Sequence, residues 1–285
     1  MRHVTAILLF LLFSPMLLSA KRLHVSLLGN DNQDGLSWGT ARRTVQSAID
    51  SATAGDDVWV AEGCHTATRI RACDSAYLFA SSFILKDGVS LYGGFKGDED
   101  TLEARPRDGN LQWKFRHATV LTVPSETPGS VLHTDEVEFE HSTIIDGFTL
   151  CGGMALGVGF EGSGGGAVLP GNVIMQNCIV QGNLARDGGG VATSGNATIR
   201  QCLIRDNEVV DEGWSGCGGG LLCEGDGAII ENCLILANGQ EGTVRYGGGI
   251  HAMGAARIAF CTVVDNCAIR SRSRLHHSLY GHRYR

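Results

Sequence analysis

After residue 20 the sequence has no apolar run long enough to cross a lipid bilayer, so no transmembrane segment is predicted in the mature chain. It also has no Cys-x-x-Cys motif and no histidine cluster, which argues against a zinc site. Positive charge is in deficit, with 23 basic against 30 acidic residues and a formal net charge of −7. This acidic balance argues against general nucleic-acid binding.

The first 20 residues have the features of a secretory signal peptide. Arg2 and His3 form a short basic segment, and the apolar run Val4–Phe13 is too short to span a membrane. A cleavage site is predicted after Ala20, and no cysteine follows it, which argues against a lipoprotein anchor. We therefore expect an exported protein that is secreted or displayed at the cell surface.

One pattern occurs four times in the second half of the chain. Three consecutive glycines are followed, twelve or thirteen positions later, by Cys-x-(Ile or Val)-x-x-Asn. The triplets are Gly164–Gly166, Gly188–Gly190, Gly218–Gly220 and Gly247–Gly249; the cysteines are Cys178, Cys202, Cys233 and Cys261; the asparagines are Asn183, Asn207, Asn238 and Asn266. Successive cysteines are 24, 31 and 28 residues apart. Such a period indicates one solenoid coil per repeat.

Apolar residues alternate with period two on both sides of each cysteine, which is typical of short β-strands. These positions are Val173/Met175, Ala197/Ile199, Ala228/Ile230 and Ala256/Ile258 before it, and Val180, Ile204, Ile235 and Val263 after it. The alternation of inward and outward side chains shifts by one position at the residue before the cysteine, which predicts a bend between two strands. A third short strand follows each glycine triplet. Three strands and three corners describe one coil of a parallel β-helix.

The repeated residues have structural roles in this fold and are poor candidates for a site. The glycines allow positive φ and close packing at a corner. The asparagines are expected at another corner, where an amide tolerates the left-handed conformation and bonds to the amides of adjacent coils. The cysteines are expected to stack inside the helix as thiols.

Variation in coil length falls at one corner, which we call the variable edge. From the corner residue to the next glycine triplet the gap is 10 residues after Gly153, then 4, 10 and 8 residues after Asn183, Asn207 and Asn238. Insertions in solenoids lie on one face, and that face is often the binding face. The variable edge is therefore where we look for function.

The chain is predicted to have four parts. Residues 1–20 are the signal peptide, 21–145 the N-terminal cap and first coils, 146–269 the regular repeats, and 270–285 a basic, disordered tail. Thr40–Ala54 is predicted as one amphipathic helix that covers the open end of the β-helix, with Val45, Ala48, Ile49 and Ala52 on its apolar face. Further strands are expected at residues 58–60, 82–85, 89–92, 119–123, 131–134 and 143–150, and a surface loop at 96–110.

Ten cysteines in an exported chain would normally suggest a disulfide framework. Four of them belong to the stacked positions and are expected to stay reduced. Cys64 and Cys73 lie nine residues apart in a non-repeating segment and are the best disulfide pair. Cys217 with Cys223 is the weaker candidate.

Several segments resemble bacterial secreted right-handed parallel β-helix proteins of the pectin-lyase-like superfamily. They are Asp34–Trp38, Thr44–Ala48, Gly55–Gly63, Leu91–Phe95 and Asp146–Leu150. The coils resemble the repeats of polymorphic outer-membrane proteins, except that those repeats usually have phenylalanine at the positions of Val180, Ile204, Ile235 and Val263. The resemblance implies an all-β fold, a single right-handed parallel β-helix with an N-terminal capping α-helix, and a secreted or surface location.

The resemblance does not imply one activity, because the superfamily contains lyases, hydrolases and adhesins. The Asn-Thr-Asp, Gly-His-Gly and Arg-Ile-Lys strings of polygalacturonases do not occur here. Pectate lyases need acidic calcium ligands beside an arginine base. Acids and arginines do occur near the variable edge, but without a recognisable motif: Arg186, Asp187, Arg205, Asp206, Asp211, Glu212, Glu241 and Arg245.

We therefore predict an adhesin-like protein that binds polysaccharide or another cell-surface component, without catalysis and without a cofactor. The candidate binding residues are Asp211, Glu212, Trp214, Glu241, Arg245 and Tyr246. An exposed aromatic ring beside acids can stack on a sugar face, whereas the alternative is that both rings pack under their own loops.

Two other functions remain open. One is a calcium-dependent polysaccharide lyase or a glycoside hydrolase acting on acidic polysaccharide, with Ca²⁺ needed only for the lyase. The other is a truncated surface-protein fragment without activity of its own, because the repeats stop at Asn266 and neither a C-terminal barrel nor a capping strand pattern follows.

Overall fold

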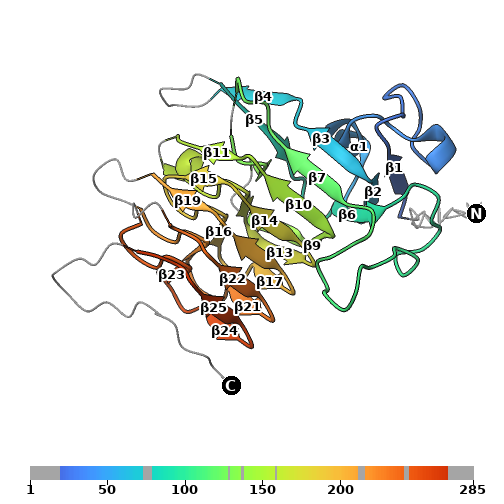
Figure 1. Ribbon diagram of the computed structural model, residues 1–285. Coiled ribbons are helices and arrows are strands. Elements are labelled where there is room, and N and C mark those ends of the chain that lie inside the picture. The colour runs from blue at the N-terminus through green and yellow to red at the C-terminus, as the bar shows by residue number, and fades with distance from the viewer. Residues whose placement is uncertain are drawn as a thin grey trace, which may run out of the picture.

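The computed structural model describes residues 20–72, 79–127, 129–135, 138–157, 159–210, 216–240 and 244–268. The chain winds into stacked coils whose strands form three long sheets (Figure 1). Neighbouring strands run parallel, as in β13 with β17, apart from the antiparallel pair β4 and β5. The predicted all-β parallel β-helix is confirmed. The predicted signal peptide and the basic tail lie outside the described residues, except for Ala20.

Sheet 1 has eight strands: β1 (Arg22–Val25), β2 (Asp57–Ala61), β6 (Ser90–Phe95), β9 (Glu138–Asp146), β13 (Gly171–Gln176), β17 (Thr198–Arg200), β21 (Ile229–Glu231) and β24 (Arg257–Ala259). Sheet 2 has seven: β3 (Gly63–Thr66), β7 (Thr119–Thr122), β10 (Phe148–Cys151), β14 (Ile179–Gln181), β18 (Leu203–Arg205), β22 (Leu234–Leu236) and β25 (Thr262–Val264).

Sheet 3 also has seven strands: β4 (Arg69–Ala72), β5 (Phe79–Ile84), β8 (Leu132–His133), β12 (Ala167–Leu169), β16 (Val191–Ser194), β20 (Leu221–Glu224) and β23 (Ile250–Ala252). A short sheet at the variable edge contains β11 (Met154–Ala155), β15 (Leu184–Ala185) and β19 (Glu208–Val209). The helices are α1 (Val45–Ser51) and the 3₁₀ turns η1 (Trp38–Thr40) and η2 (Gly159–Gly162).

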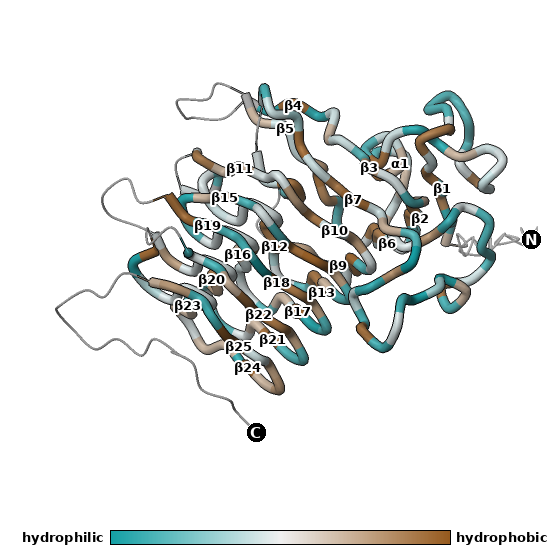
Figure 2. The backbone as a smooth tube through the Cα atoms, viewed as in Figure 1, coloured by the Kyte–Doolittle hydropathy of each residue, from teal (hydrophilic) through white to brown (hydrophobic). Residues whose placement is uncertain are grey.

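The core runs along the axis of the β-helix because equivalent residues of successive coils are paired in register. Met175 pairs with Ile199, and Ile199 with Ile230, and all three side chains are buried. Hydrophobic segments recur along the strands of successive coils, and the corners are more hydrophilic (Figure 2). The period-two alternation in the sequence therefore reports this interior correctly.

The four repeated cysteines stack inside the β-helix as free, buried thiols, as predicted. Burial raises the pKa of Cys202 well above its usual range. The residue before each cysteine is left-handed, with φ of 54° or 55° at Asn177, Gln201, Asn232 and Phe260. One positive φ reverses the direction in which the next side chains point, which confirms the predicted bend.

The repeated asparagines form the predicted ladder of amides. Nδ2 of Asn183 donates to Oδ1 of Asn207 at 2.9 Å, Asn207 donates to Asn238 at 3.0 Å, and Asn238 donates to Asn266 at 2.8 Å. The expected left-handed conformation of these asparagines is wrong. It belongs to the residue before each of them: Gly182, Asp206, Ala237 and Asp265. The preceding residue makes the turn, and the asparagine then directs its amide into the coil corner.

The glycine triplets have the two roles predicted for them. The first glycine of each triplet has φ between 61° and 66°. The third approaches the next coil closely, since a Cβ on Gly190 would lie 2.6 Å from the carbonyl oxygen of Gly220. A side chain there would push adjacent coils apart.

The capping helix is shorter than predicted, because α1 begins after Thr44 and ends at Ser51. Arg42 is extended instead: its N–H donates to the carbonyl of His24 at 2.8 Å, and its carbonyl accepts from Ser26 at 2.9 Å. The predicted apolar face is nevertheless correct. Its members are all buried in the core: Val45, Ala48, Ile49 and Ala52.

Gln46 of this helix replaces a neighbouring strand at the edge of β5. The pairing of β5 with β4 stops at Ser82, two residues before Ile84. The amide of Gln46 accepts from the N–H of Ile84 at 2.8 Å and donates to its carbonyl at 3.4 Å. The cap thus satisfies backbone groups that an open sheet edge would expose.

Two further expectations need correction. Residues 143–150 form parts of two strands, β9 and β10, because Gly147 turns between them with φ of 82°. The segment 96–110 is not wholly a surface loop, because Arg105 folds back and forms a buried ion pair with Asp146 at 2.9 Å. Burying a guanidinium group is costly unless a carboxylate pairs with it. The partner Asp146 lies 41 residues further along the chain, so the local sequence does not predict that Arg105 is buried.

The weaker disulfide prediction is wrong, because Cys217 and Cys223 are both free thiols. Cys64 on β3 is also an exposed free thiol, which does not support its predicted pairing with Cys73, and Cys73 itself lies outside the described residues. In the part of the chain that the structure describes, no helix is long and apolar enough to cross a membrane.

Candidate functional site

The outer face of sheet 3 carries a column of buried residues under the variable edge. Val168 pairs with Ala192, Ala192 with Leu222, and Leu222 with His251. Their neighbours in sequence line the core, so these side chains point outward. Val168, Ala192 and Leu222 are nevertheless only 2–3% exposed. A Cβ on Gly188 would lie 3.1 Å from Cβ of Leu222, so the chain arriving from the variable edge packs on this face.

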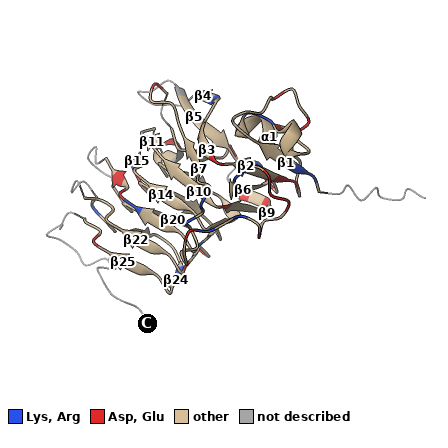
Figure 3. Ribbon diagram, turned by 45° about the vertical axis from the view of Figure 1, so that its right-hand side comes forward, with Lys and Arg blue, Asp and Glu red and all other residues tan. Residues whose placement is uncertain are grey.

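The residues just before the glycine triplets form a second column at this edge. Ser163 pairs with Asp187, and Cys217 pairs with Tyr246. The N–H of Gly188 donates to the carbonyl of Cys217 at 2.8 Å, which joins the two pairs. Side chains from four coils are thereby aligned beside the outer face of sheet 3. Elsewhere, charged residues gather mainly at corners and strand ends (Figure 3).

Charged groups surround Cys217 in this column. Oδ1 of Asp187 accepts from the N–H groups of Gly216 and Cys217, both at 3.0 Å. Burial, then the negative charges of Asp187 and Glu224, raise the pKa of the Cys217 thiol to about 11, while Arg245 acts in the opposite direction. Burial and the charge of Asp187 also raise the pKa of Glu224. Two carboxylates and one guanidinium therefore lie within electrostatic range of one thiol.

An aromatic pair adjoins these charges one coil further on. Tyr246 is 41% exposed, so its ring is not packed under its own loop. Its centroid lies 5.8 Å from the His251 ring, at an interplanar angle of 34°. We call Asp187, Cys217, Glu224, Arg245, Tyr246 and His251 the edge cluster.

Only two of the predicted binding residues, Arg245 and Tyr246, can be placed, and both belong to the edge cluster. The remaining four lie outside the described residues: Asp211, Glu212, Trp214 and Glu241. Among the residues considered for a lyase, Asp187 also belongs to the cluster.

Three other residues considered for a lyase have separate positions. Arg186 donates through Nε to the carbonyl of Leu156 at 2.9 Å. Arg205 donates to Oε1 of Gln181, on the outer face of sheet 2. Asp206 makes a left-handed corner turn with φ of 53°. Sequence reasoning missed Glu224. The one feature that could have identified it is its position at the end of β20, where the period-two alternation directs its side chain outward.

A second polar cluster lies at the other end of the same face. Arg71 on β4 binds both carboxylate oxygens of Glu161 in η2, at 3.1 and 2.9 Å. His133 on β8 is 1% exposed, and its Nε2 lies 3.8 Å from Glu161. Burial, then the charge of Arg71, lower the pKa of His133 to about 4. Sequence reasoning missed this cluster, because Arg71 and Glu161 are 90 residues apart.

Metal ligands do not converge at either cluster. Within the described ranges, no group of three His, Cys, Asp or Glu side chains is arranged to hold a metal ion. The groups that are present instead suit hydrogen bonding and ring stacking: carboxylates, guanidinium groups and the exposed ring of Tyr246 beside the half-buried ring of His251.

Comparison with known protein families agrees with this architecture. A sequence model described as "right handed beta helix region" matches residues 129–276. A comparison with curated protein sequences found no match.

A search of solved structures found matches that include the following three. Pectate lyase Pel9A has a TM-score of 0.48 and 13% identity, over 77% of this chain and 49% of that one. A rhamnogalacturonan lyase has a TM-score of 0.47 and 12% identity, over 88% of this chain and 66% of that one. The pectin methylesterase of Aspergillus niger has a TM-score of 0.36 and 12% identity, over 91% of this chain and 92% of that one. This chain therefore spans about half the length of the pectate lyase.

Proposed function

This chain belongs to the right-handed β-helix family, and we propose that it is a secreted or cell-surface member that binds polysaccharide through the variable edge without turnover. The observation that carries the proposal is the Tyr246–His251 ring pair, with Tyr246 exposed and His251 half-buried, beside the charges of Asp187, Glu224 and Arg245. A sugar ring has an apolar face that stacks on an aromatic ring, and hydroxyls that bond to carboxylates and guanidinium groups.

The arrangement along the axis favours a polymer over a compact ligand. The polar cluster around His133 on β8 and the ring pair at β23 are separated by four strand spacings. At about 4.8 Å per spacing, this is about 19 Å. A polysaccharide lying along the axis would reach the partly exposed Glu161 of the first cluster and Tyr246 of the second at once. Export is supported by the sequence of residues 1–20.

A glycoside hydrolase is the second candidate, and one observation favours it. Glu224 has a raised pKa beside a second carboxylate, Asp187, and glycosidases use such a pair as acid and base. However, one oxygen of Asp187 already accepts from two backbone N–H groups, which gives this residue a structural role. We therefore rank binding first.

The test is retention of the protein on a panel of neutral and uronate polysaccharides, with the same panel assayed for new reducing ends and for the absorbance of unsaturated products. Tyr246→Ala should weaken retention at least tenfold, and Arg245→Ala should weaken it less. Phe260→Ala is the matched control, because it removes a ring that is 68% exposed at the corner between β24 and β25.

Each outcome discriminates between the candidates. Retention that is lost in Tyr246→Ala but kept in Phe260→Ala supports the binder. Turnover abolished by Glu224→Gln would replace it with the hydrolase, and turnover abolished by a chelator would replace it with the calcium-dependent lyase. Neither retention nor turnover on any polymer would refute both and leave a surface protein with a purely structural role.

A further inference from the structure

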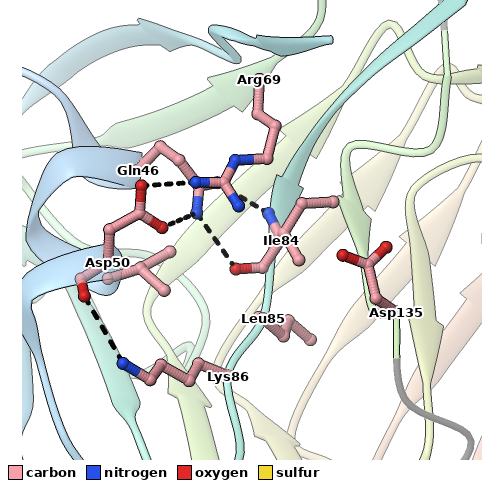
Figure 4. A pocket seen from close by; sticks show the side chains of 8 residues that line it. Gln46, Asp50, Arg69, Ile84, Leu85, Lys86 and Asp135 are labelled. Carbon is pink, nitrogen blue, oxygen red and sulfur yellow. Dashed lines mark hydrogen bonds and ion pairs between the residues drawn. The ribbon is translucent and has the colours of Figure 1, made fainter. Parts of the chain in front are cut away.

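A cavity of about 260 Å³ lies between the cap and the first strands of sheet 3 (Figure 4). One wall is α1, with Gln46, Ile49 and Asp50, and another is formed by β4, β5 and the residues just after β5. Asp135, two residues beyond β8, closes the far side, facing the Asp50–Arg69 pair across the cavity. Its size is just below the range of drug-sized ligand pockets, about 300–1,000 Å³, and so suits a smaller ligand.

Part of the lining is committed to holding the cavity open. Nζ of Lys86 donates to the carbonyls of Ala52 and Asp50 at the C-terminal end of α1. Oδ1 of Asp50 accepts from Gln46 at 2.9 Å, while its Oδ2 binds Arg69. These bonds fix the helix against β4 and β5 without any ligand. The cavity is therefore preorganised, which reduces the entropy cost of binding.

Two other groups are placed to meet a ligand. The Asp135 side chain is 62% exposed and lies 3.5 Å from the nearest nitrogen of Arg71, which Glu161 holds more closely. The Arg69 side chain is 40% exposed and binds Asp50 through one terminal nitrogen, and a guanidinium group has further N–H donors. An acceptor and a donor thus face the same space from opposite sides.

The lining also indicates the kind of ligand. Arg69 and Lys86 balance Asp50 and Asp135, so the four charged groups sum to zero and do not select an anion or a cation. Ile49 and Leu85 lie at the base of the cavity but are only 1% and 4% exposed, so polar side chains make up most of the accessible lining. A small uncharged molecule with several hydroxyl groups matches this combination.

We propose that this cavity is a second carbohydrate site, which takes one neutral sugar unit. The inference rests on the proposed function for the class of ligand, but not for the position of the site. Ile84, in the cavity wall, pairs in register with His133, and both follow core residues, so their side chains lie on the outer side of sheet 3, the side that also carries the edge cluster. A bound polysaccharide would place an end unit here and continue toward Tyr246.

Binding would link the cap to the coils. A sugar contacting both α1 and Asp135 binds the folded protein and not the unfolded chain, so it raises the melting temperature by mass action. The shift should grow with the logarithm of ligand concentration above the dissociation constant. A sugar bound at the edge cluster would also raise the melting temperature, so the variants, and not the shift alone, identify the site.

The experiment is titration of the full chain with glucose, galactose and galacturonate, read by calorimetry and by thermal unfolding. Asp135→Asn should weaken binding of the neutral sugar at least tenfold. Asp98→Asn should not, and it is a matched control because its carboxylate is 63% exposed and also beside a single cation. Asp135→Trp, which fills the mouth, should abolish binding.

The outcomes separate this inference from the proposed function. Neutral-sugar binding that survives Tyr246→Ala but not Asp135→Asn supports the cavity, even if no polymer is retained. Polymer retention without saturable monosaccharide binding would overturn the cavity alone. Tighter binding of galacturonate than of both neutral sugars would overturn the charge argument, and equal affinity in Asp135→Asn and wild type would overturn the site.

Discussion

Replacing Asn207 with alanine should destabilise the β-helix strongly, because its amide joins three coils. The side chain is fully buried and makes four hydrogen bonds. Nδ2 donates to the carbonyl of Val180 and to Oδ1 of Asn238, both at 3.0 Å. Oδ1 accepts from the N–H of Asn183 at 3.1 Å and from its Nδ2 at 2.9 Å. At about 0.5–1.5 kcal/mol per bond, the expected loss is about 2–6 kcal/mol.

Asn196→Ala is the matched control, because Asn196 also bonds to an asparagine of the preceding coil. Its amide exchanges two bonds of 2.9 Å with Asn172, but at an exposed corner where water can replace them. We expect a loss below about 1 kcal/mol. The assay is urea unfolding followed by far-UV circular dichroism, with both variants at one protein concentration. Equal losses in the two variants would refute the reasoning, because burial would then not set the value of the ladder.

Three further predictions concern stability. Cys202→Asp should cost at least about 3 kcal/mol by burying an unpaired charge, and an unchanged melting temperature would show that the position is not interior. The free energy of unfolding should fall by up to about 3 kcal/mol as the pH drops from about 6.5 to about 4, because the unfolded state binds a proton that buried His133 does not. Urea unfolding across this range should show a weaker pH dependence for His133→Gln than for the wild type. The same pH dependence in both proteins would contradict the assignment to His133. Gln46→Leu removes both hydrogen bonds to Ile84 and should lower the free energy of unfolding by about 1–3 kcal/mol. Hydrogen exchange of the β5 amides should become faster, and unchanged exchange would contradict this role of Gln46.

The sequence predicts the coils well because the determinants repeat locally. Each repeated cysteine and asparagine packs against or bonds to the equivalent residue of the next coil. The same residue type recurring once per repeat in the sequence therefore predicts that contact directly. The left-handed residue is predicted one position too late, because Asp206 and Asn207 are both acceptable turn residues and only the ladder decides between these two adjacent corner positions. Periodicity alone cannot resolve that choice.

The functional regions are less predictable, because they depend on contacts without a period. Gln46 meets Ile84 across 38 residues, and Arg71 meets Glu161 across 90. Neither pair alters the alternation of apolar residues from which the strands are predicted, so the sequence gives no sign of these contacts. The variable edge was predicted from insertion lengths, but Glu224 joins it from a strand end that looks like any other.

The asparagine ladder also has a kinetic consequence. Its rungs are 24, 31 and 28 residues apart, so each new coil closes a loop of nearly the same length on the coil before it. The entropy lost on loop closure therefore stays nearly constant as the solenoid grows. The first coil has an edge already covered by Gln46 and provides the template for the second. Folding is thus expected to start at the cap and to propagate coil by coil toward the C-terminus, in the order in which the chain is synthesised.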